Sequence, residues 1–330
     1  MIIRKICILL LPFLFVFVLQ NSAQEHDSIY RQKSFINFGL FGGLCTNGKK
    51  TIETTNNISL SLLHGSNRNV YGFAFAPFNY IESSMYGLQI GFNNAAFEEV
   101  RGIQIGFGNG TKNLKGTQIG GFNLTEESHG IQLGFLNIQK SGGLQIGMIN
   151  ISHHNNYPIG FINIIKDGNM NAGMTIDEMS LVTTNFRSGG RYLYGIAGIG
   201  YSFASSLNHV VLEGGIGTHL HISDKFRIDT EISATHISKV YSYMGSSEEA
   251  KETARNYDYK TASRFSLRLV PSARFGNHIE VSGGPTLNYL QSQCMDNKKI
   301  FPSHYMWRKF TKTSLRQVHW GWITGVQYKF

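Results

Sequence analysis

The sequence predicts an all-β protein that combines two kinds of strand arrangement. Three observations predict it. A Gly-rich motif recurs between residues 72 and 163, long alternating segments follow from about residue 170, and the 330 residues include 37 Gly, 23 Phe and 15 Tyr but only 6 Pro. So few prolines exclude collagen, and 42% hydrophobic residues exclude a disordered chain. After the N-terminus, no run approaches the roughly 20 apolar residues of a membrane-spanning helix.

Residues 1–23 are predicted to be a secretory signal peptide. Arg4 and Lys5 precede the apolar run Ile6–Leu19, and Ala23 supplies a small residue for cleavage. That run is too short to span a membrane comfortably. Removing the two cations lowers the formal net charge from +9 to +7. The chain has no run of Lys and Arg residues that would indicate nucleic-acid binding. An anionic lipid or polysaccharide surface is therefore the more suitable partner for an exported chain.

Two cysteines remain after cleavage, Cys45 and Cys294. An exported protein can pair such residues, but two distant cysteines do not define a disulfide framework. Whether they pair is left open.

The repeat motif reads Gly, apolar, Gln, apolar, Gly, apolar, variable, Asn. Its full copies occupy Gly87–Asn94, Gly102–Asn109, Gly116–Asn123, Gly130–Asn137 and Gly143–Asn150. Weaker copies at Gly72–Asn79 and Asn156–Asn163 complete a seven-copy repeat with a period of 13–15 residues. The conserved spacing within the copies produces two sets of polar residues: Gln89, Gln104, Gln118, Gln132 and Gln145, and Asn94, Asn109, Asn123, Asn137 and Asn150.

Two architectures fit a short-period β repeat, a solenoid and an antiparallel sheet. In a solenoid, the Gln and Asn residues stack in columns that can hydrogen-bond along their length. The near-constant spacer favours this arrangement, because membrane barrels usually alternate short turns with long loops. The Gln and Asn columns are expected to form hydrogen bonds with the backbone and with neighbouring side chains. The alternative is that they form a binding face. The low charge of the chain further leads us to expect an apolar repeat interior.

The Gly-x-Gln-x-Gly-x-x-Asn unit, over residues 72–163, resembles a family of bacterial surface repeat proteins. The resemblance implies export and surface exposure. It brings no established activity.

The C-terminal part is predicted to form antiparallel strands of an outer-membrane-type β-barrel. Phe226, Ile228 and Ile232 alternate with the charged residues Arg227, Asp229 and Glu231, and such segments are long enough to cross a bilayer when tilted. The chain also ends on Phe330, which resembles the last-strand signal of bacterial outer-membrane barrels. Seven strands are expected near 172–186, 192–204, 209–223, 226–240, 263–275, 279–292 and 317–330.

The sequence also leads to expectations about the number of barrel strands and about the loops that connect them. Bacterial single-chain barrels have even strand numbers, so an eighth strand is sought in Asn57–Leu63, or the repeat strands join one larger barrel. Tight turns are expected at 223–225 and 276–278, and long connections at 241–262 and 293–316.

No residue is assigned to catalysis, a cofactor or a metal. The chain has no Gly-x-Ser-x-Gly elbow and no P-loop. His219, His221 and Glu213 share a strand face, but no Cys and no third His stands at a spacing typical of a metal site. The inward charges are expected to pair with one another and fill the barrel, with a lumen for anionic solutes as the alternative.

The basic, aromatic segment 293–316 offers a candidate interface at Tyr305, Trp307, Arg308 and Lys309. These residue types suit an anchor at lipid headgroups, or a glycan-binding surface.

The sequence therefore predicts an exported, non-enzymatic protein of the bacterial outer membrane or cell surface. It divides into a signal peptide (1–23), an N-terminal segment with one or two strands (24–71), the repeat (72–163) and the barrel-like region (164–330). The expected partner is outer-membrane lipid, with a surface glycan as a second candidate and no nucleic acid or cofactor. Alternative functions are a binding module for a glycan or host ligand, a small-solute pore and, least favoured, a barrel enzyme.

Overall fold

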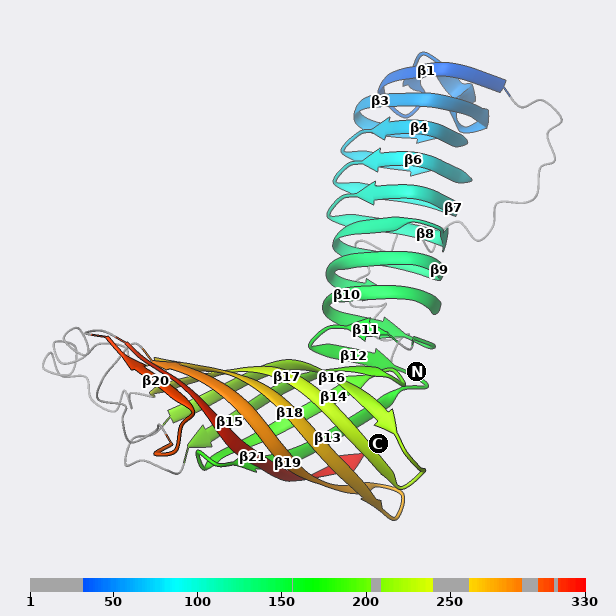
Figure 1. The fold of residues 1–330 in the computed structure, drawn as a ribbon. Helices are drawn as coiled ribbons and strands as arrows, with labels where there is room; N and C mark the ends of the chain where they lie inside the picture. The colour runs from blue at the N-terminus through cyan, green and yellow to red at the C-terminus, as the bar shows by residue number, and fades with distance from the viewer. Residues whose placement is uncertain (1–31, 156, 203–208, 240–260, 293–301, 312–313) are drawn as a thin grey trace, which may run out of the picture.

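The computed structural model describes residues 32–155, 157–202, 209–239, 261–292, 302–311 and 314–330. Within these residues the chain forms a parallel β-solenoid followed by a closed antiparallel barrel (Figure 1). The predicted signal peptide and Cys294 lie outside the described residues, and Cys45 is half-buried near the start of the solenoid.

The solenoid runs from Gln32 to Ile165, and its coils stack in parallel, with one antiparallel pair between the first two strands. Gly87 pairs with Gly102, and Gln89 with Gln104, so equivalent motif positions lie in one column. The solenoid interpretation is thus confirmed and the antiparallel one is wrong. The elements are β1 (Gln32–Phe41), β2 (Leu44–Cys45), the 3₁₀ helix η1 (Gly48–Glu53), β3 (Thr54–Asn67), β4 (Asn69–Phe75), β5 (Phe78–Ile81), β6 (Ser84–Ile90), β7 (Asn93–Ile105), β8 (Gly108–Leu114), β9 (Thr117–Ile138), β10 (Ser141–Ser152), β11 (Pro158–Ile159) and β12 (Ile162–Ile165).

The solenoid interior is polar, which corrects the expectation of an apolar repeat core. Gln104 and its equivalents point inward and are fully buried, whereas the flanking Ile103 and Ile105 point outward and are exposed. A smaller apolar cluster, Val70, Ala74, Ile81, Met85, Ala96, Val100 and Leu114, fills the interior of the N-terminal coils. Amides can occupy the remaining interior because each finds its hydrogen-bond partner in the identical residue of the next coil.

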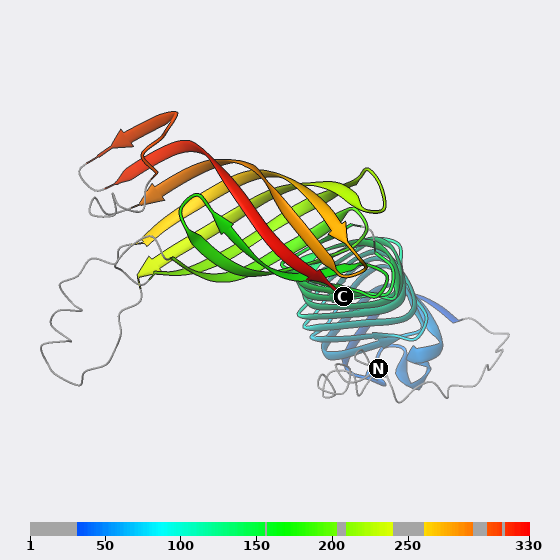
Figure 2. The ribbon, with the colours of Figure 1, turned by 90° about the horizontal axis from the view of Figure 1, so that it is seen from below.

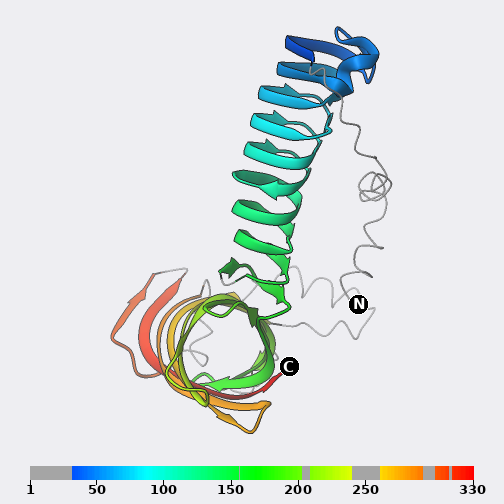
Figure 3. The same ribbon diagram turned by 90° about the vertical axis from the view of Figure 1, so that its right-hand side faces the viewer.

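The barrel closes because its first and last strands pair. β13 pairs with β21 in antiparallel register from Asn171 opposite Lys329 to Asp177 opposite Ile323, and Figures 2 and 3 show the resulting cylinder. Eight strands of the described residues form it: β13 (Asn169–Asp177), β14 (Leu181–Gly189), β15 (Leu193–Ser202), β16 (His209–His221), β17 (Phe226–Lys239), β18 (Thr261–Phe275), β19 (Ile279–Ser292) and β21 (Leu315–Lys329).

The eighth strand comes from a turn that the sequence analysis missed. The predicted strand 172–186 is wrong: it is two strands, β13 and β14, reversed at residues 178–180. The carboxylate of Asp177 makes this turn by accepting hydrogen bonds from the backbone N–H groups of Met179 (2.9 Å) and Leu181 (3.1 Å). Asn57–Leu63 belongs instead to β3 of the solenoid, and the repeat strands form a separate sheet from the barrel.

The two barrel ends differ in their connections. Residues 190–192, 222–225 and 276–278 turn at one end, hereafter the tight-turn end, where β13 begins and β21 finishes. At the opposite end β20 (Trp307–Phe310) pairs with Leu315–Val318 of β21. This short strand lies within the segment 293–316 that was expected to be a loop.

The solenoid joins the barrel at the tight-turn end and packs on the outside of its wall. Asn163 of the last coil donates its backbone N–H to Ser188 Oγ (2.9 Å) and its side-chain Nδ2 to Ser188 O (3.0 Å). Gly195 allows the close approach, because a Cβ there would collide with the carbonyl oxygen of Gly160. The long axis of the solenoid runs across the barrel axis rather than along it (Figures 1 and 3).

Candidate functional site

The barrel wall is apolar outside and polar inside. On β17, Ile232 is 59% exposed while its neighbours Glu231 and Ser233 are each 1% exposed. β18 repeats the pattern with outward Phe265 and Leu267. Soluble sandwiches and small soluble barrels bury their apolar face, so the exposed face of this barrel has the opposite polarity to theirs.

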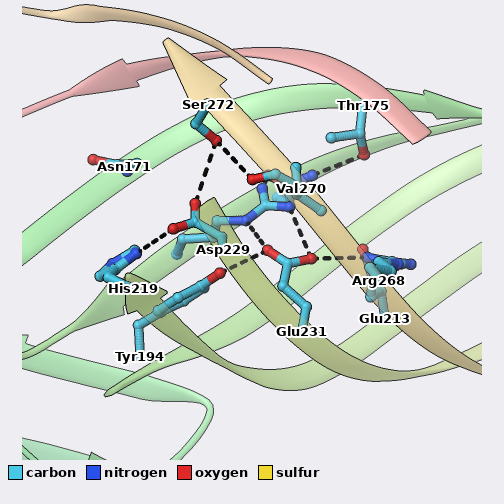
Figure 4. Close-up of polar contacts among 12 residues, drawn as sticks. Asn171, Thr175, Tyr194, Glu213, His219, Asp229, Glu231, Arg268, Val270 and Ser272 are labelled. Carbon is cyan, nitrogen blue, oxygen red and sulfur yellow. Dashed lines mark hydrogen bonds and ion pairs between the residues drawn. The ribbon is translucent and has the colours of Figure 1, made fainter. Parts of the chain in front are cut away.

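One cluster of buried charges inside the barrel centres on Glu231. Its carboxylate accepts hydrogen bonds from Arg187 Nε (2.8 Å), Tyr194 Oη (2.9 Å) and Arg268 Nη1 (3.4 Å). Arg268 in turn forms an ion pair with Glu213 at 2.5 Å. These residues come from five strands and are buried inside the barrel, where the labelled members point toward one another (Figure 4).

A second cluster lies nearer the tight-turn end and centres on Arg227. It pairs with Asp229 (Nε to Oδ2, 3.0 Å) and with Glu280 (Nη2 to Oε2, 2.8 Å). Asp229 also contacts His219 Nδ1 at 2.7 Å, and Glu280 contacts Arg274 at 2.9 Å. The charges expected to point inward therefore pair with one another.

The opposite end of the barrel interior is closed by apolar residues. Met179, Leu181, Val211, Ile237, Ala262, Leu290 and Leu315 form one buried cluster there. Arg264 lies beneath it and pairs with Asp177 at 2.6 Å. At the tight-turn mouth, the cavity beside Arg227 and Glu280 measures about 10 Å³, which is close to the minimum for one water molecule. Among the described residues, side chains thus fill the barrel interior at both of these levels.

The His219, His221 and Glu213 group does not form a joint site. Glu213 is engaged by Arg268, and His219 by Asp229, while His221 is exposed at the tight-turn mouth. Across the described ranges, no three His, Cys, Asp or Glu side chains are arranged to hold a metal ion.

The asparagine column of the repeat is a continuous hydrogen-bonded ladder inside the solenoid. Each Nδ2 donates to the Oδ1 of the next coil, from Asn79 through to Asn163, at 2.8–2.9 Å. Each member also donates to a backbone carbonyl, as Asn123 does to Leu133 O at 2.9 Å. The ladder ends on the barrel, where Asn163 binds Ser188.

The glutamine column forms a second ladder that runs in the opposite direction. Each Nε2 donates to the Oε1 of the preceding coil at 2.8–3.0 Å, from Gln145 back to Gln89. The column ends below Ala74, and Gln89 Nε2 is buried without a hydrogen-bond partner. Because both columns are buried, they cannot form a binding face on the surface.

The ladder makes a testable contribution to stability. We expect Asn123→Ala to lower the free energy of unfolding of the solenoid by about 2 kcal/mol, because it leaves the Asn137 Oδ1 and Leu133 O acceptors without their donor. Urea unfolding of the full chain in detergent, followed by protease resistance of the segment 32–165, measures the change. Asn113→Ala, in a spacer, is the matched control, and equal losses in both variants would contradict a special role for the ladder.

The candidate interface at Tyr305, Trp307, Arg308 and Lys309 lies on and beside β20, at the end opposite the tight turns. Tyr305 and Trp307 are exposed. The guanidinium of Arg308 lies 4.0 Å from the centre of the Tyr305 ring and donates to Gln317 Oε1 at 2.6 and 2.8 Å. Lys309 is exposed on the same strand. The structure brings these four residues together on one short hairpin.

The solenoid also exposes an apolar surface that was not predicted from the sequence, with Phe92, Phe107 and Phe135 among its residues. The alternation within the motif could have predicted this surface, since an inward Gln requires its two apolar neighbours on the strand to point outward. No helix in the described residues is both long enough and apolar enough to cross a membrane. No protein-family model and no curated protein matches this chain.

Proposed function

We propose that this protein is an exported, non-enzymatic component of the bacterial outer membrane, in which the barrel is the membrane anchor and the solenoid is the part that it positions. The observation that carries the proposal is the polarity of the barrel. A wall with outward Ile232, Phe265 and Leu267 exposes to water an apolar belt that lipid would cover. Inward charges are tolerated because they are paired.

The filled lumen favours an anchor over a pore. Charge clusters centred on Glu231 and Arg227 occupy the middle of the barrel, and the apolar cluster around Leu290 closes one end. A solute would have to break several buried ion pairs to pass. The resemblance of the repeat to bacterial surface proteins and the predicted signal peptide agree with an exported location.

Membrane fractionation tests the proposal. We expect the mature chain to sediment with outer membranes, to resist salt and carbonate washes, and to require detergent for extraction. In detergent, it should migrate as a compact species on gels unless it is boiled. Recovery as a soluble periplasmic monomer would overturn the proposal.

A second candidate function is glycan binding at the β20 hairpin. The observation that favours it is the exposure of Tyr305 and Trp307 beside Arg308, an arrangement that can stack on sugars and contact anionic groups. We expect a Tyr305→Ala/Trp307→Ala variant to lose binding on a glycan array while keeping its membrane location. If the unchanged protein binds no glycan on the array, the hairpin is better explained as an anchor at lipid headgroups.

A further inference from the structure

The solenoid is amphipathic around its circumference. Every charged residue between 72 and 163 lies in the spacers that connect motif copies: Glu82, Glu98, Glu99, Arg101, Lys112, Lys115, Glu126, Glu127 and Lys140. Glu99 illustrates the polar edge. It pairs with Lys115 at 2.7 Å and with Arg101, and hydrogen bonding to Lys115, helped by Arg101, lowers the pKa of its carboxyl group. Charge is thus confined to one edge.

The opposite edge is a row of large apolar side chains, which we call the Phe ridge. It consists of the residue after the second motif glycine in every copy from Gly87 onward except the third, where Gly121 stands beneath the Phe107 ring: Phe92, Phe107, Phe135, Met148 and Phe161. Their side chains are 42–53% exposed. Phe92 and Phe107 stack with ring centres 5.2 Å apart, and the outward Ile105 and Ile119 widen the ridge on one flank. A contiguous apolar surface of this kind marks an interaction site.

The contacts of the last coil fix how the ridge is oriented relative to the barrel. Where the last motif copy begins, directly after its spacer, Tyr157 stacks on Tyr192 of a tight turn, with ring centres 5.7 Å apart. On the ridge edge, Phe161 reaches the middle of the wall, where its ring lies against the backbone of Gly214. Residues 157–161 therefore run from the tight-turn end to the middle of the wall, which places the preceding spacer toward the tight-turn end and the Phe ridge toward the apolar belt of the barrel.

The ridge and the belt are continuous. Phe161 lines a hollow of about 280 Å³ together with Leu212, Ala234 and Phe265, which point outward from the barrel wall. Because the solenoid axis runs across the barrel axis (Figures 1 and 3), a barrel that spans a bilayer would hold the ridge parallel to the membrane plane. The lipid that covers the belt would then contact the ridge along its length.

We propose that the solenoid lies on the membrane surface at the tight-turn end of the barrel, with its Phe ridge inserted among the acyl chains of that leaflet and its charged spacers in water. This inference rests on the proposed membrane-embedded barrel. Lipid is the partner that covers the ridge, because the ridge continues the apolar belt of the barrel. In addition, the charged residues of the repeat are confined to the spacers along its whole length, as in other amphipathic elements that lie in a membrane interface.

Single-tryptophan fluorescence of the full chain in phosphatidylcholine vesicles with brominated acyl chains tests the proposal. Trp307, Trp320 and Trp322 are replaced by Phe, and one reporter is then added by Phe107→Trp on the ridge or by Lys112→Trp in a spacer. A variant that retains only Trp322, which points outward from the wall, reports on the barrel. We expect the ridge and barrel reporters to be quenched several-fold more by brominated lipid than the spacer reporter.

The outcomes separate this inference from the proposed function. If Trp322 is quenched by lipid and the ridge reporter is not, the barrel spans the membrane and the ridge proposal fails. If neither is quenched, both proposals fail. A ridge reporter protected from aqueous iodide but insensitive to brominated lipid would show that protein, such as a second copy of the chain, covers the ridge. Phe135→Trp provides a second ridge reporter if the first variant does not fold.

Discussion

Gly102→Ala is expected to disrupt the solenoid. The Cβ of the alanine would lie 1.9 Å from the carbonyl oxygen of Gly87 in the coil below, and 2.8 Å from both its carbonyl carbon and its amide nitrogen. The obstacle is backbone, so no side-chain movement relieves it. Gly102 also has φ of +144°, a conformation that residues with a side chain rarely adopt. Moving the coils apart would break both their parallel hydrogen bonds and the amide ladders.

We expect the loss in the free energy of unfolding to reach about 4 kcal/mol or more, the range that marks a severe backbone or core defect. Gly43→Ala is the matched control, because its nearest neighbour would be 3.8 Å from the new Cβ. Thermal unfolding by far-UV circular dichroism, with limited proteolysis of the segment 32–165, compares the two variants. Equal protease resistance in both would show that the coils can separate without cost.

The repeat predicted a stack of short β units, and its near-constant spacer favoured a solenoid over an antiparallel sheet. Which side chains face inward could not be derived from hydrophobicity. Hydrophobicity alone would place Leu88 and Ile90 in the core and Gln89 at the surface, yet Gln89 is buried. The glutamine ladder explains the inward orientation of Gln89. Burying an amide costs little free energy when the neighbouring coils supply its hydrogen-bond partners.

The barrel shows a similar division. Alternation along 226–235 correctly assigned Arg227, Asp229 and Glu231 to the interior, because side chains on a strand alternate strictly between faces. The pairs they form could not be predicted. Glu231 meets Arg187, which lies 44 residues earlier in the chain, and only the register of four neighbouring strands brings the two together. The turn at Asp177 was missed because the flanking strands continue the same alternation.

Glu231→Leu is expected to prevent the barrel from folding to its native form. The substitution removes the ion pair of Arg187 and an acceptor of Tyr194 and Arg268, all of which are buried. Removing one partner of a buried ion pair costs about 3–5 kcal/mol, because the remaining charge is left without compensation. Arg268 keeps Glu213 as a partner, so most of the loss is assigned to Arg187.

A double variant tests that assignment. Arg187→Met/Glu231→Leu removes both charges, and we expect it to recover most of the stability, because an apolar pair of similar volume can replace a buried ion pair at little cost. The measurement is the fraction of the full chain that refolds in detergent to a compact, heat-modifiable form, with its urea midpoint. Ile232→Leu on the outer wall is the control and should be unchanged. If the double variant is no more stable than Glu231→Leu alone, the cost lies in the packing around Tyr194 rather than in the unpaired arginine.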